Sequence, residues 1–332
     1  MFKNRKVSGP TILALSLFLA FALAPRLALA VGYANPELVI ETDQLDKMSN
    51  QANVRIIDVR PNAAYRKGHI PNAQHLGADD IIDPNSRIEA ALLPEAKLAA
   101  MLGERGIGKD TKVILYDDRG GFHAARVFWM LEYFGHRDVA ILNGGFPKWE
   151  KEGRKVTTLV PRAKVAKFPI DVTERRIATA DWVLERKDDS NVVVVDVRPP
   201  KVYEQGHIPW ARSIPWSQNL TSESTLKSAD ELTKHFESNG VKKENNVVVH
   251  CQQGKAAGHS YYALRVLGYP RVRSYDRSWA EWGADEALPK AGQVAMAPKA
   301  TTANPCGAAP SNPCAIDTLK RTLQKGLESL GK

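Results

Sequence analysis

Apolar runs of strand length alternate with longer helical segments along most of the chain. The runs fall at residues 54–58, 113–116, 139–142, 192–196 and 247–250. One of the helical segments covers residues 261–267 and is ended by Gly268. Strands that alternate with helices in this way predict an α/β fold, in which a mainly parallel sheet is flanked by helices on both faces.

The second half of the chain repeats the first half. Residues 58–73 and 196–211 align without a gap and are identical at ten of sixteen positions, including Asp-Val-Arg-Pro and Gly-His-Ile-Pro. Further matches continue in the same order over more than a hundred residues, which chance similarity does not produce. The pattern therefore indicates a duplicated domain rather than a short-period solenoid.

Changes in amino-acid composition along the chain indicate where each of the two copies begins and ends. A stretch rich in Lys, Arg, Val and Pro separates them, and prolines recur after the second copy. Leucines spaced on one helix face end the chain. We predict a first domain, a linker, a second domain, and a Pro-rich linker with a short C-terminal helix, at residues 36–152, 153–177, 178–287 and 288–332.

The first thirty residues predict a signal peptide. A basic start is followed by an apolar run at residues 11–24 and by Ala-Leu-Ala at residues 28–30, so cleavage before Val31 is expected. The alternative is an uncleaved anchor, but the run is short for a membrane span and Pro25 and Arg26 interrupt it. We expect an exported mature protein, periplasmic in a bacterium, with no membrane span.

The net charge of the chain indicates which kind of binding partner to expect. The formal net charge is +9, and four of the positive charges lie in the first thirty residues. The moderately basic remainder suits small anions. Because no basic stripe with interleaved aromatic residues is present, no nucleic-acid partner is indicated.

The most informative cysteine is Cys251, which follows an apolar strand and precedes a helix in the stretch His-Cys-Gln-Gln-Gly-Lys-Ala-Ala-Gly. Loop amides and the positive end of the helix dipole would face its sulfur. Such an environment favours the thiolate, which is the nucleophilic form. The alternative is a buried structural cysteine. The polar loop, which includes Lys255, argues against that alternative, as does its position at a strand end.

The other two cysteines, Cys306 and Cys314, flank a flexible segment near the C-terminus. A disulfide between them would leave Cys251 as the one free thiol. This tail offers too few ligands for a metal site, and no metal or organic cofactor is indicated.

The duplication separates scaffold from chemistry. Cys251 aligns with Asp117, so the first domain lacks the nucleophile. Asp-Val-Arg and Gly-His-Ile-Pro occur in both domains, which indicates a structural role for them. His207 is a conceivable base for Cys251, but its counterpart His69 lies in the domain without a thiol.

Together these features resemble the tandem-domain rhodaneses, a family of sulfurtransferases, over roughly residues 36–284. The duplicated elements, the cysteine loop and the stretch Tyr-Asp-Arg-Ser-Trp at residues 275–279 carry the resemblance. It implies an inactive first domain and a catalytic second domain. It also implies that Cys251 takes a sulfane sulfur from a donor such as thiosulfate, as a persulfide. The sulfur then passes to a thiophilic acceptor such as cyanide, a thiol or a carrier protein.

The loop is expected to hold the anionic donor and the persulfide through its amides and through the charge of Lys255. The candidate substrate-binding residues are Gln252, Gln253, Gly254, Lys255, Ala256 and Arg198.

Departures from the family pattern leave the donor open. Thiosulfate-specific members typically carry Arg-Lys-Gly after the cysteine and 3-mercaptopyruvate-specific members Gly-Ser-Gly, whereas this chain has Gln-Gln-Gly. Val202, next to Lys201, stands where thiosulfate enzymes place a substrate-binding arginine.

Three alternatives to a thiosulfate sulfurtransferase are therefore kept. The first is a 3-mercaptopyruvate sulfurtransferase, and the second is a non-catalytic periplasmic sulfur carrier or persulfide relay. The third, a cysteine phosphatase of the same fold, is disfavoured because Ala257 occupies the position of its phosphate-clamping arginine.

Overall fold

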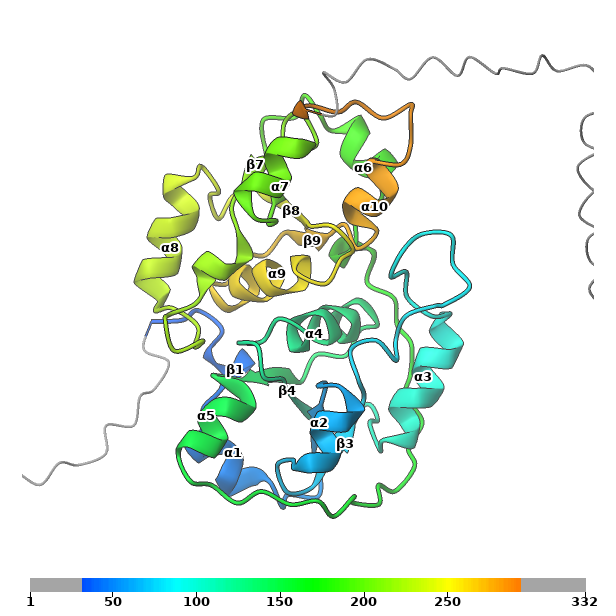
Figure 1. Ribbon diagram of the computed structural model, residues 1–332, viewed down its shortest axis with the longest axis vertical. Helices are drawn as coiled ribbons and strands as arrows, with labels where there is room; N and C mark the ends of the chain where they lie inside the picture. The colour runs from blue at the N-terminus through cyan, green and yellow to red at the C-terminus, as the bar shows by residue number, and fades with distance from the viewer. Residues whose placement is uncertain (1–31, 294–332) are drawn as a thin grey trace, which may run out of the picture.

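The computed structural model describes residues 32–293 (Figure 1). The predicted signal peptide, the cysteine pair Cys306 and Cys314 and the predicted C-terminal helix lie outside the described residues. Among the described residues, no helix has the length and apolar character that crossing a bilayer requires.

The first domain contains one parallel sheet in the order β1-β5-β4-β2-β3. Its strands are β1 (Val39–Ile40), β2 (Val54–Asp58), β3 (Ala73–His75), β4 (Lys112–Tyr116) and β5 (Val139–Leu142). Its helices are η1 (Pro36–Leu38), α1 (Thr42–Met48), α2 (Asn62–Lys67), α3 (Glu95–Glu104), α4 (Ala124–Tyr133) and α5 (Gly145–Lys151).

The second domain contains a parallel sheet in the order β7-β6-β8-β9. Its strands are β6 (Val192–Asp196), β7 (Arg212–Ser213), β8 (Asn246–His250) and β9 (Val272–Ser274). A 3-10 turn, η2 (Glu174–Arg176), precedes the domain. Its helices are α6 (Ala180–Glu185), α7 (Pro200–Gln205), η3 (Trp216–Asn219), α8 (Ala229–Ser238), α9 (Ala257–Val266) and α10 (Ser278–Trp282). The predicted α/β class is confirmed, with two similar parallel sheets.

Helices cover both faces of each sheet. Because successive residues of a strand point to opposite faces, neighbours in one strand belong to different cores. In β4, Val113 and Leu115 belong to the core that includes α3 and α4, whereas Ile114 packs with residues of α1 and α5. In β8, Val249 belongs to the core that includes α8 and α9, whereas Val248 packs with residues of α6 and α10.

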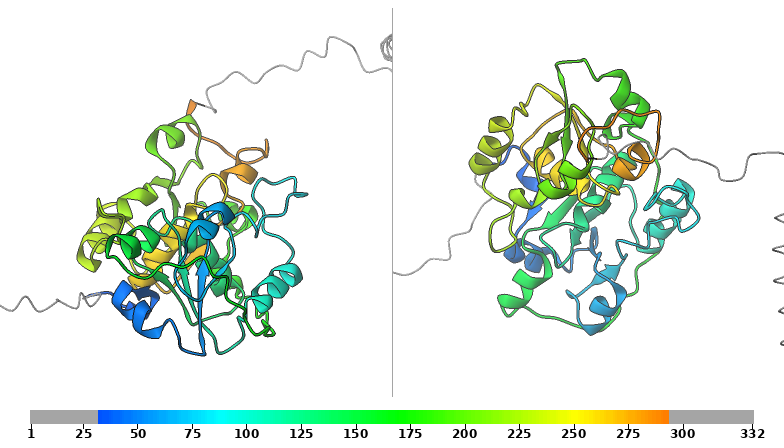
Figure 2. Two further views of the ribbon diagram at one scale, coloured as in Figure 1. Left: turned by 60° about the horizontal axis from the view of Figure 1, so that its bottom comes forward. Right: turned by 45° about the horizontal axis from the view of Figure 1, so that its top comes forward.

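Helices α4 and α9 pack against each other between the two sheets (Figures 1 and 2). Both helices are buried on nearly every side, as expected for helices inside a core. Gly258 permits their close approach, since a Cβ there would lie 2.7 Å from backbone atoms of Arg126. Core residues of the two domains form one continuous cluster. The domains therefore meet through a core-like interface, which fixes the loops at its edge.

Candidate active site

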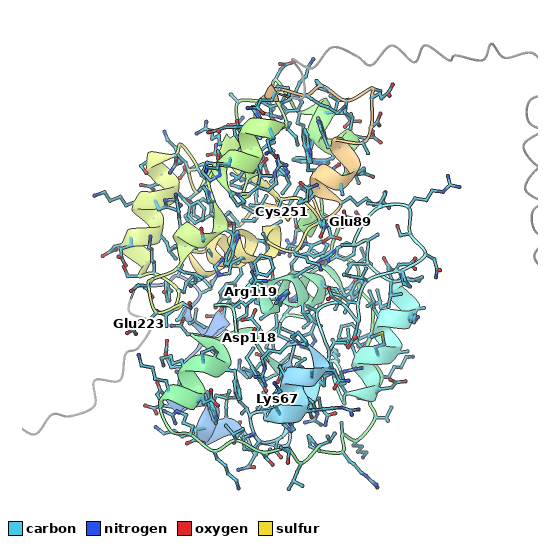
Figure 3. The ribbon with its side chains drawn as sticks, viewed as in Figure 1. Lys67, Glu89, Asp118, Arg119, Glu223 and Cys251 are labelled. Atoms are coloured by element: carbon cyan, nitrogen blue, oxygen red, sulfur yellow. The ribbon has the colours of Figure 1, made fainter. Side chains whose placement is uncertain are left out.

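Cys251 directly follows β8, the strand that lies between β6 and β9, and its side chain is 3% exposed. It lies where the second domain meets the first (Figure 3). Among residues 32–293 it is the one cysteine, and it is not disulfide-bonded. The carboxyl edge of a parallel sheet, where ligands bind in open α/β folds, therefore carries a single free thiol.

Ser278 anchors the start of the cysteine loop. Its Oγ accepts hydrogen bonds from the amides of Cys251 and Gly254, each at 3.1 Å, and donates to the carbonyl of Tyr275 at 2.8 Å. The same oxygen lies 4.0 Å from Cys251 Sγ. Ser278 adopts a φ of 54°, which is uncommon for a residue with a side chain. Ser278 lies in the stretch at residues 275–279 that resembles the family, but no local sequence pattern links its hydroxyl to the cysteine loop.

The rest of the loop is pinned from the same side. The carbonyls of Cys251 and Gln252 accept hydrogen bonds from the amides of Trp279 (3.1 Å) and Ala280 (2.9 Å). Gly254 has a φ of 78°, and a Cβ there would overlap the carbonyl and carboxylate of Asp276. The backbone of α10 and its preceding turn therefore fixes the loop, and only glycine fits at position 254.

Several amides of the cysteine loop have no hydrogen-bond acceptor in the part of the chain that the structure describes. Within residues 32–293, no hydrogen bond joins the backbone N–H of Gln253, Lys255 or Ala256 to a protein acceptor. Successive backbone N–H groups that are free of protein acceptors at the end of a strand are typical of an anion-binding concavity.

The first domain shows the same concavity filled. Asp117 follows β4 as Cys251 follows β8, and its carboxylate is fully buried. It accepts hydrogen bonds from the amides of Arg119 (2.9 Å), Gly121 (2.8 Å), His123 (2.7 Å) and Ala124 (3.1 Å). The amides two and four residues after Asp117 correspond to those of Gln253 and Lys255 after Cys251. The aspartate thus supplies the negative charge that its loop is built to hold.

Arg198 is held by the scaffold and reaches the loop with one nitrogen. Its Nε and Nη2 bond to the carboxylate of Asp196 (2.9 and 2.6 Å), and Nη2 also bonds to the carbonyl of Gly206 (2.6 Å). Its Nη1 lies 3.2 Å from Oε1 of Gln252. Arg60 makes the equivalent bonds to Asp58 in the first domain. The Asp-Val-Arg element therefore makes the same contacts in both domains, and Arg198, a candidate substrate-binding residue, reaches the loop through Nη1 and Gln252.

The two Gly-His-Ile-Pro histidines occupy equivalent positions in the two domains. His207 Nδ1 lies 2.9 Å from the carbonyl of Tyr203, and the two rings stack with centroids 3.7 Å apart. His69 and Tyr65 repeat this arrangement at 2.9 and 3.9 Å. Both histidines therefore make the same local contacts with the tyrosine four residues earlier.

Lys255 points to the first domain rather than standing free. Its Nζ lies 2.8 Å from Oδ1 of Asp79, in the loop after β3. The hydrogen bond from Lys255 is the main reason that the pKa of Asp79 is lowered. The loop cation that sequence reasoning identified therefore already has an anionic partner, which sequence reasoning missed.

Buried ion pairs join the two domains, one of them beside the cysteine loop. Arg126 of α4 donates to both carboxylate oxygens of Asp276, at 3.0 Å from Nη2. Glu132 of α4 accepts from Arg265 of α9 at 3.0 Å and from the hydroxyl of Tyr261. Because Asp276 also touches Gly254, the first domain supports the cysteine loop through this pair.

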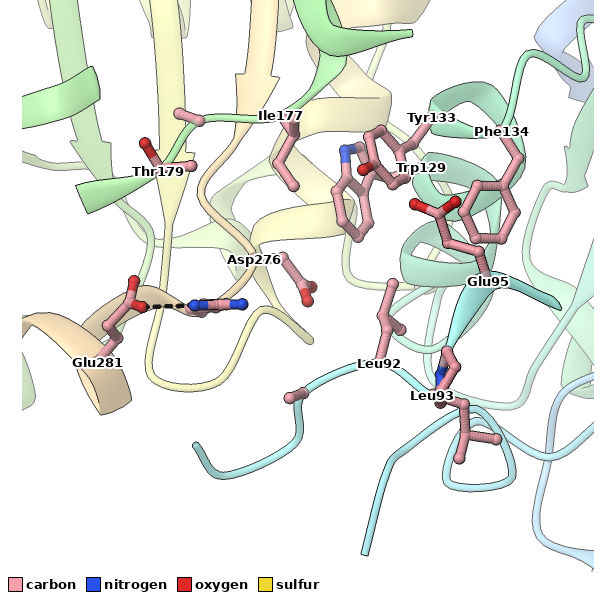
Figure 4. A pocket seen from close by; sticks show the side chains of 14 residues that line it. Leu92, Leu93, Glu95, Trp129, Tyr133, Phe134, Ile177, Thr179, Asp276 and Glu281 are labelled. Carbon is pink, nitrogen blue, oxygen red and sulfur yellow. Dashed lines mark hydrogen bonds and ion pairs between the residues drawn. The ribbon is translucent and has the colours of Figure 1, made fainter. Parts of the chain in front are cut away.

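A cavity of about 310 Å³ lies on the far side of Asp276 (Figure 4). Leu92, Trp129, Tyr133 and Ile177 form apolar walls, and Asp276 with Arg277 forms a charged end. Arg277 is paired with Glu281 at 2.9 Å. Cys251 is not among the lining residues, so this cavity adjoins the cysteine loop without containing the thiol.

A family model described as the rhodanese-like domain matches residues 41–152 and 179–285. The chain belongs to the rhodanese family. The family resemblance of the sequence is thus confirmed, and so is the tandem arrangement of two rhodanese-like domains.

Known relatives have related functions in sulfur transfer. The sulfur carrier protein TtuD of Thermus thermophilus is 36% identical over 276 residues, covering 76% of this chain and 96% of TtuD. A thiosulfate sulfurtransferase of Pseudomonas aeruginosa is 29% identical over 265 residues, with the same coverages of 76% and 96%. The crystal structure of SseA from Escherichia coli, a 3-mercaptopyruvate sulfotransferase, matches with a TM-score of 0.68 at 28% identity, covering 73% of this chain and 98% of SseA. These relatives place the chain in a sulfurtransferase family.

Proposed function

We propose that this protein is a sulfurtransferase that carries a sulfane sulfur on Cys251 as a persulfide. The observation that supports this most directly is the pair of matched loops. Asp117 shows that amides at these positions hold a buried anion, and the corresponding amides of Gln253 and Lys255 have no partner within residues 32–293. A persulfide anion on Cys251 would meet those donors in place of a carboxylate.

The transfer has two steps. The thiolate of Cys251 attacks the outer sulfur of thiosulfate, the sulfur–sulfur bond breaks, and sulfite leaves with the electron pair. An acceptor thiolate, or cyanide, then attacks the outer sulfur of the persulfide and returns Cys251 to its thiolate. The loop amides are fixed in advance by Ser278 and α10, so little reorganisation accompanies the appearance of charge.

The first domain acts as a scaffold in this proposal. Its loop is filled by Asp117, whose carboxylate cannot accept a sulfane sulfur. Its contribution is the interface, where Arg126 holds Asp276 and Asp79 pairs with Lys255. In this proposal, the second domain carries the reactive loop and the first domain supports it.

Thiosulfate is the proposed donor, with 3-mercaptopyruvate as the alternative. The thiosulfate sulfurtransferase of Pseudomonas aeruginosa supports the first and the likeness to SseA supports the second. The similarity to TtuD favours a further possibility, a carrier that loads sulfur but does not turn over with small acceptors.

Steady-state kinetics of the mature protein test these functions. We expect repeated turnover with thiosulfate and cyanide, measured as thiocyanate formed per protein. Turnover with 3-mercaptopyruvate and cyanide, but not with thiosulfate, would identify 3-mercaptopyruvate as the donor. Loading of a single sulfur, without turnover for any pair of donor and acceptor, would identify a carrier. No loading of Cys251 by any sulfane sulfur donor would contradict the proposal.

We also propose that the protein is exported after cleavage before Val31. The support is the basic start, apolar run and small-residue site of the first thirty residues. N-terminal sequencing of the protein from a fractionated bacterial host should give Val31 in the periplasm. An intact Met1 in the membrane fraction would favour the uncleaved anchor.

A further inference from the structure

The ion pair between Lys255 and Asp79 couples the cysteine loop to the first domain. The nitrogen–oxygen distance is 2.8 Å, and the two residues are 176 positions apart in the sequence. The Lys255 side chain is 25% exposed, whereas that of Asp79 is 79% exposed. The lysine is thus mostly enclosed at the domain junction, while the aspartate approaches it from the solvent side.

Two other cations near the loop, Arg198 and Arg126, are already paired with carboxylates. Arg198 binds Asp196 at 2.6 Å and Arg126 binds Asp276 at 3.0 Å. Burial lowers the pKa of His123, which lies close enough to Asp79 and Lys255 to interact with both, so this imidazole is neutral near pH 7. Of these three cations, only Lys255 has an exposed carboxylate as its partner, because Asp79 is 79% exposed whereas Asp276 and Asp196 are buried.

We propose that Asp79 is a specificity-determining residue that neutralises Lys255 and so weakens the selection of dianionic donors. This inference rests on the proposed function, since it concerns donors that load Cys251. Asp79 acts through Lys255 and does not touch the reacting atoms. In consequence, the site prefers thiosulfate over sulfane sulfur donors of lower negative charge by a smaller factor than an unpaired Lys255 would give.

The physical reason is the dependence of Coulomb energy on the charge of the substrate. Asp79 holds the Lys255 ammonium at 2.8 Å, and Asp79→Asn releases that ammonium toward the donor. The attraction of a free ammonium is twice as strong for a dianion as for a monoanion at the same distance. An exposed carboxylate is screened by water and salt, so the effect is a modest factor rather than an all-or-none gate.

A comparison of two donors isolates this effect. Thiosulfate is a dianion, whereas methanethiosulfonate is a monoanion that presents the same terminal sulfur and releases methanesulfinate instead of sulfite. Loading of Cys251 is measured as kcat/KM at low salt in the wild type, Asp79→Asn, Lys255→Met and the double variant. Glu150→Gln removes the same charge from an exposed site on α5 and is the matched control.

Asp79→Asn should raise kcat/KM for thiosulfate by about two- to fivefold and that for methanethiosulfonate by less than twofold. The rise should disappear in the Lys255→Met background and shrink as ionic strength increases. Glu150→Gln should change neither donor.

The proposal is overturned if Asp79→Asn leaves thiosulfate unchanged or slower. It is also overturned if both donors rise equally, or if the rise persists without Lys255. Mass analysis of Cys251 separates this failure from failure of the proposed function. A wild type that loads sulfur, with no charge-dependent effect of Asp79, contradicts only the specificity role, whereas a wild type that loads no sulfur from either donor contradicts the sulfurtransferase itself.

Discussion

Ser278 Oγ lies 3.1 Å from the backbone nitrogen of Cys251 and accepts its hydrogen bond across 27 residues of sequence. The same oxygen accepts from Gly254, so one buried hydroxyl fixes both ends of the turn that begins the cysteine loop. The contact explains how a flexible polar sequence can present amides in a fixed array before any anion arrives.

Replacing Ser278 by alanine should loosen this array. Two buried amides would lose their acceptor, which should lower the free energy of unfolding by about 2–4 kcal/mol and slow persulfide formation about tenfold. Ser274→Ala is the matched control, because the Ser274 hydroxyl is buried without a hydrogen-bond partner among the described residues. Urea unfolding and stopped-flow loading measure the two effects. Equal stability of the two variants would show that the Ser278 contacts contribute nothing.

Cys251→Ser should abolish sulfur transfer and leave the fold intact. A serine hydroxyl fits the site of the thiol but cannot form a persulfide under these conditions. Intact-mass analysis after thiosulfate treatment should show one added sulfur in the wild type and none in the variant. Transfer by a well-folded Cys251→Ser protein would place the reactive group elsewhere.

Asp117→Asn should affect stability more than activity. The carboxylate accepts four backbone hydrogen bonds, and an amide would turn its NH2 group toward some of those donors. We expect a loss of about 2–4 kcal/mol in the free energy of unfolding and sulfur transfer within about twofold of the wild type per folded molecule. Asp118→Asn, at the exposed neighbouring position, should change neither quantity. A folded Asp117→Asn protein as inactive as Cys251→Ser would show that the first domain takes part in the chemistry.

His259 should make the protein sensitive to acid. It is buried at the domain interface, where Nε2 lies 3.0 Å from the carbonyl of Gly120 and Nδ1 3.3 Å from the Asn219 amide. Burial lowers its pKa from 6.5 to about 4. Since the folded state binds this proton less readily than the unfolded state, the stability is complete above about pH 6.5 and is lost as the pH falls toward 4. The loss should be on the order of 3 kcal/mol.

His259→Gln keeps a donor for Gly120 and does not titrate. Urea unfolding between pH 7 and pH 4.5 should therefore show a shallower dependence of stability on pH in the variant. The difference in slope should correspond to at most one proton taken up on unfolding. Burial also lowers the pKa of other histidines, which will keep part of the slope: His123, His136, His235 and His250. Identical slopes in the wild type and variant would mean that His259 is protonated within the fold.

The sequence by itself determined the fold class, the duplication and the position of Cys251 between a strand and a helix. These are local properties. The apolar runs at residues 54–58 and 247–250 match strands β2 and β8, and the contrast between Asp117 and Cys251 is visible in two aligned stretches. The repeat also predicted that Asp-Val-Arg is scaffold, because the motif occurs in the domain that has Asp117 in place of the cysteine.

Only the tertiary structure decided what surrounds Cys251. Ser278 is 27 residues away, and Asp79 is 176 residues from its partner Lys255. No local pattern links such pairs, since their contact depends on how α4 packs on α9 and on how α10 folds under the cysteine loop. The sequence presented Lys255 as a free cation for the substrate. Packing of the two domains brings Asp79 to Lys255. The loop after β3, which carries Asp79, and the loop after β8, which carries Lys255, lie side by side at the domain interface.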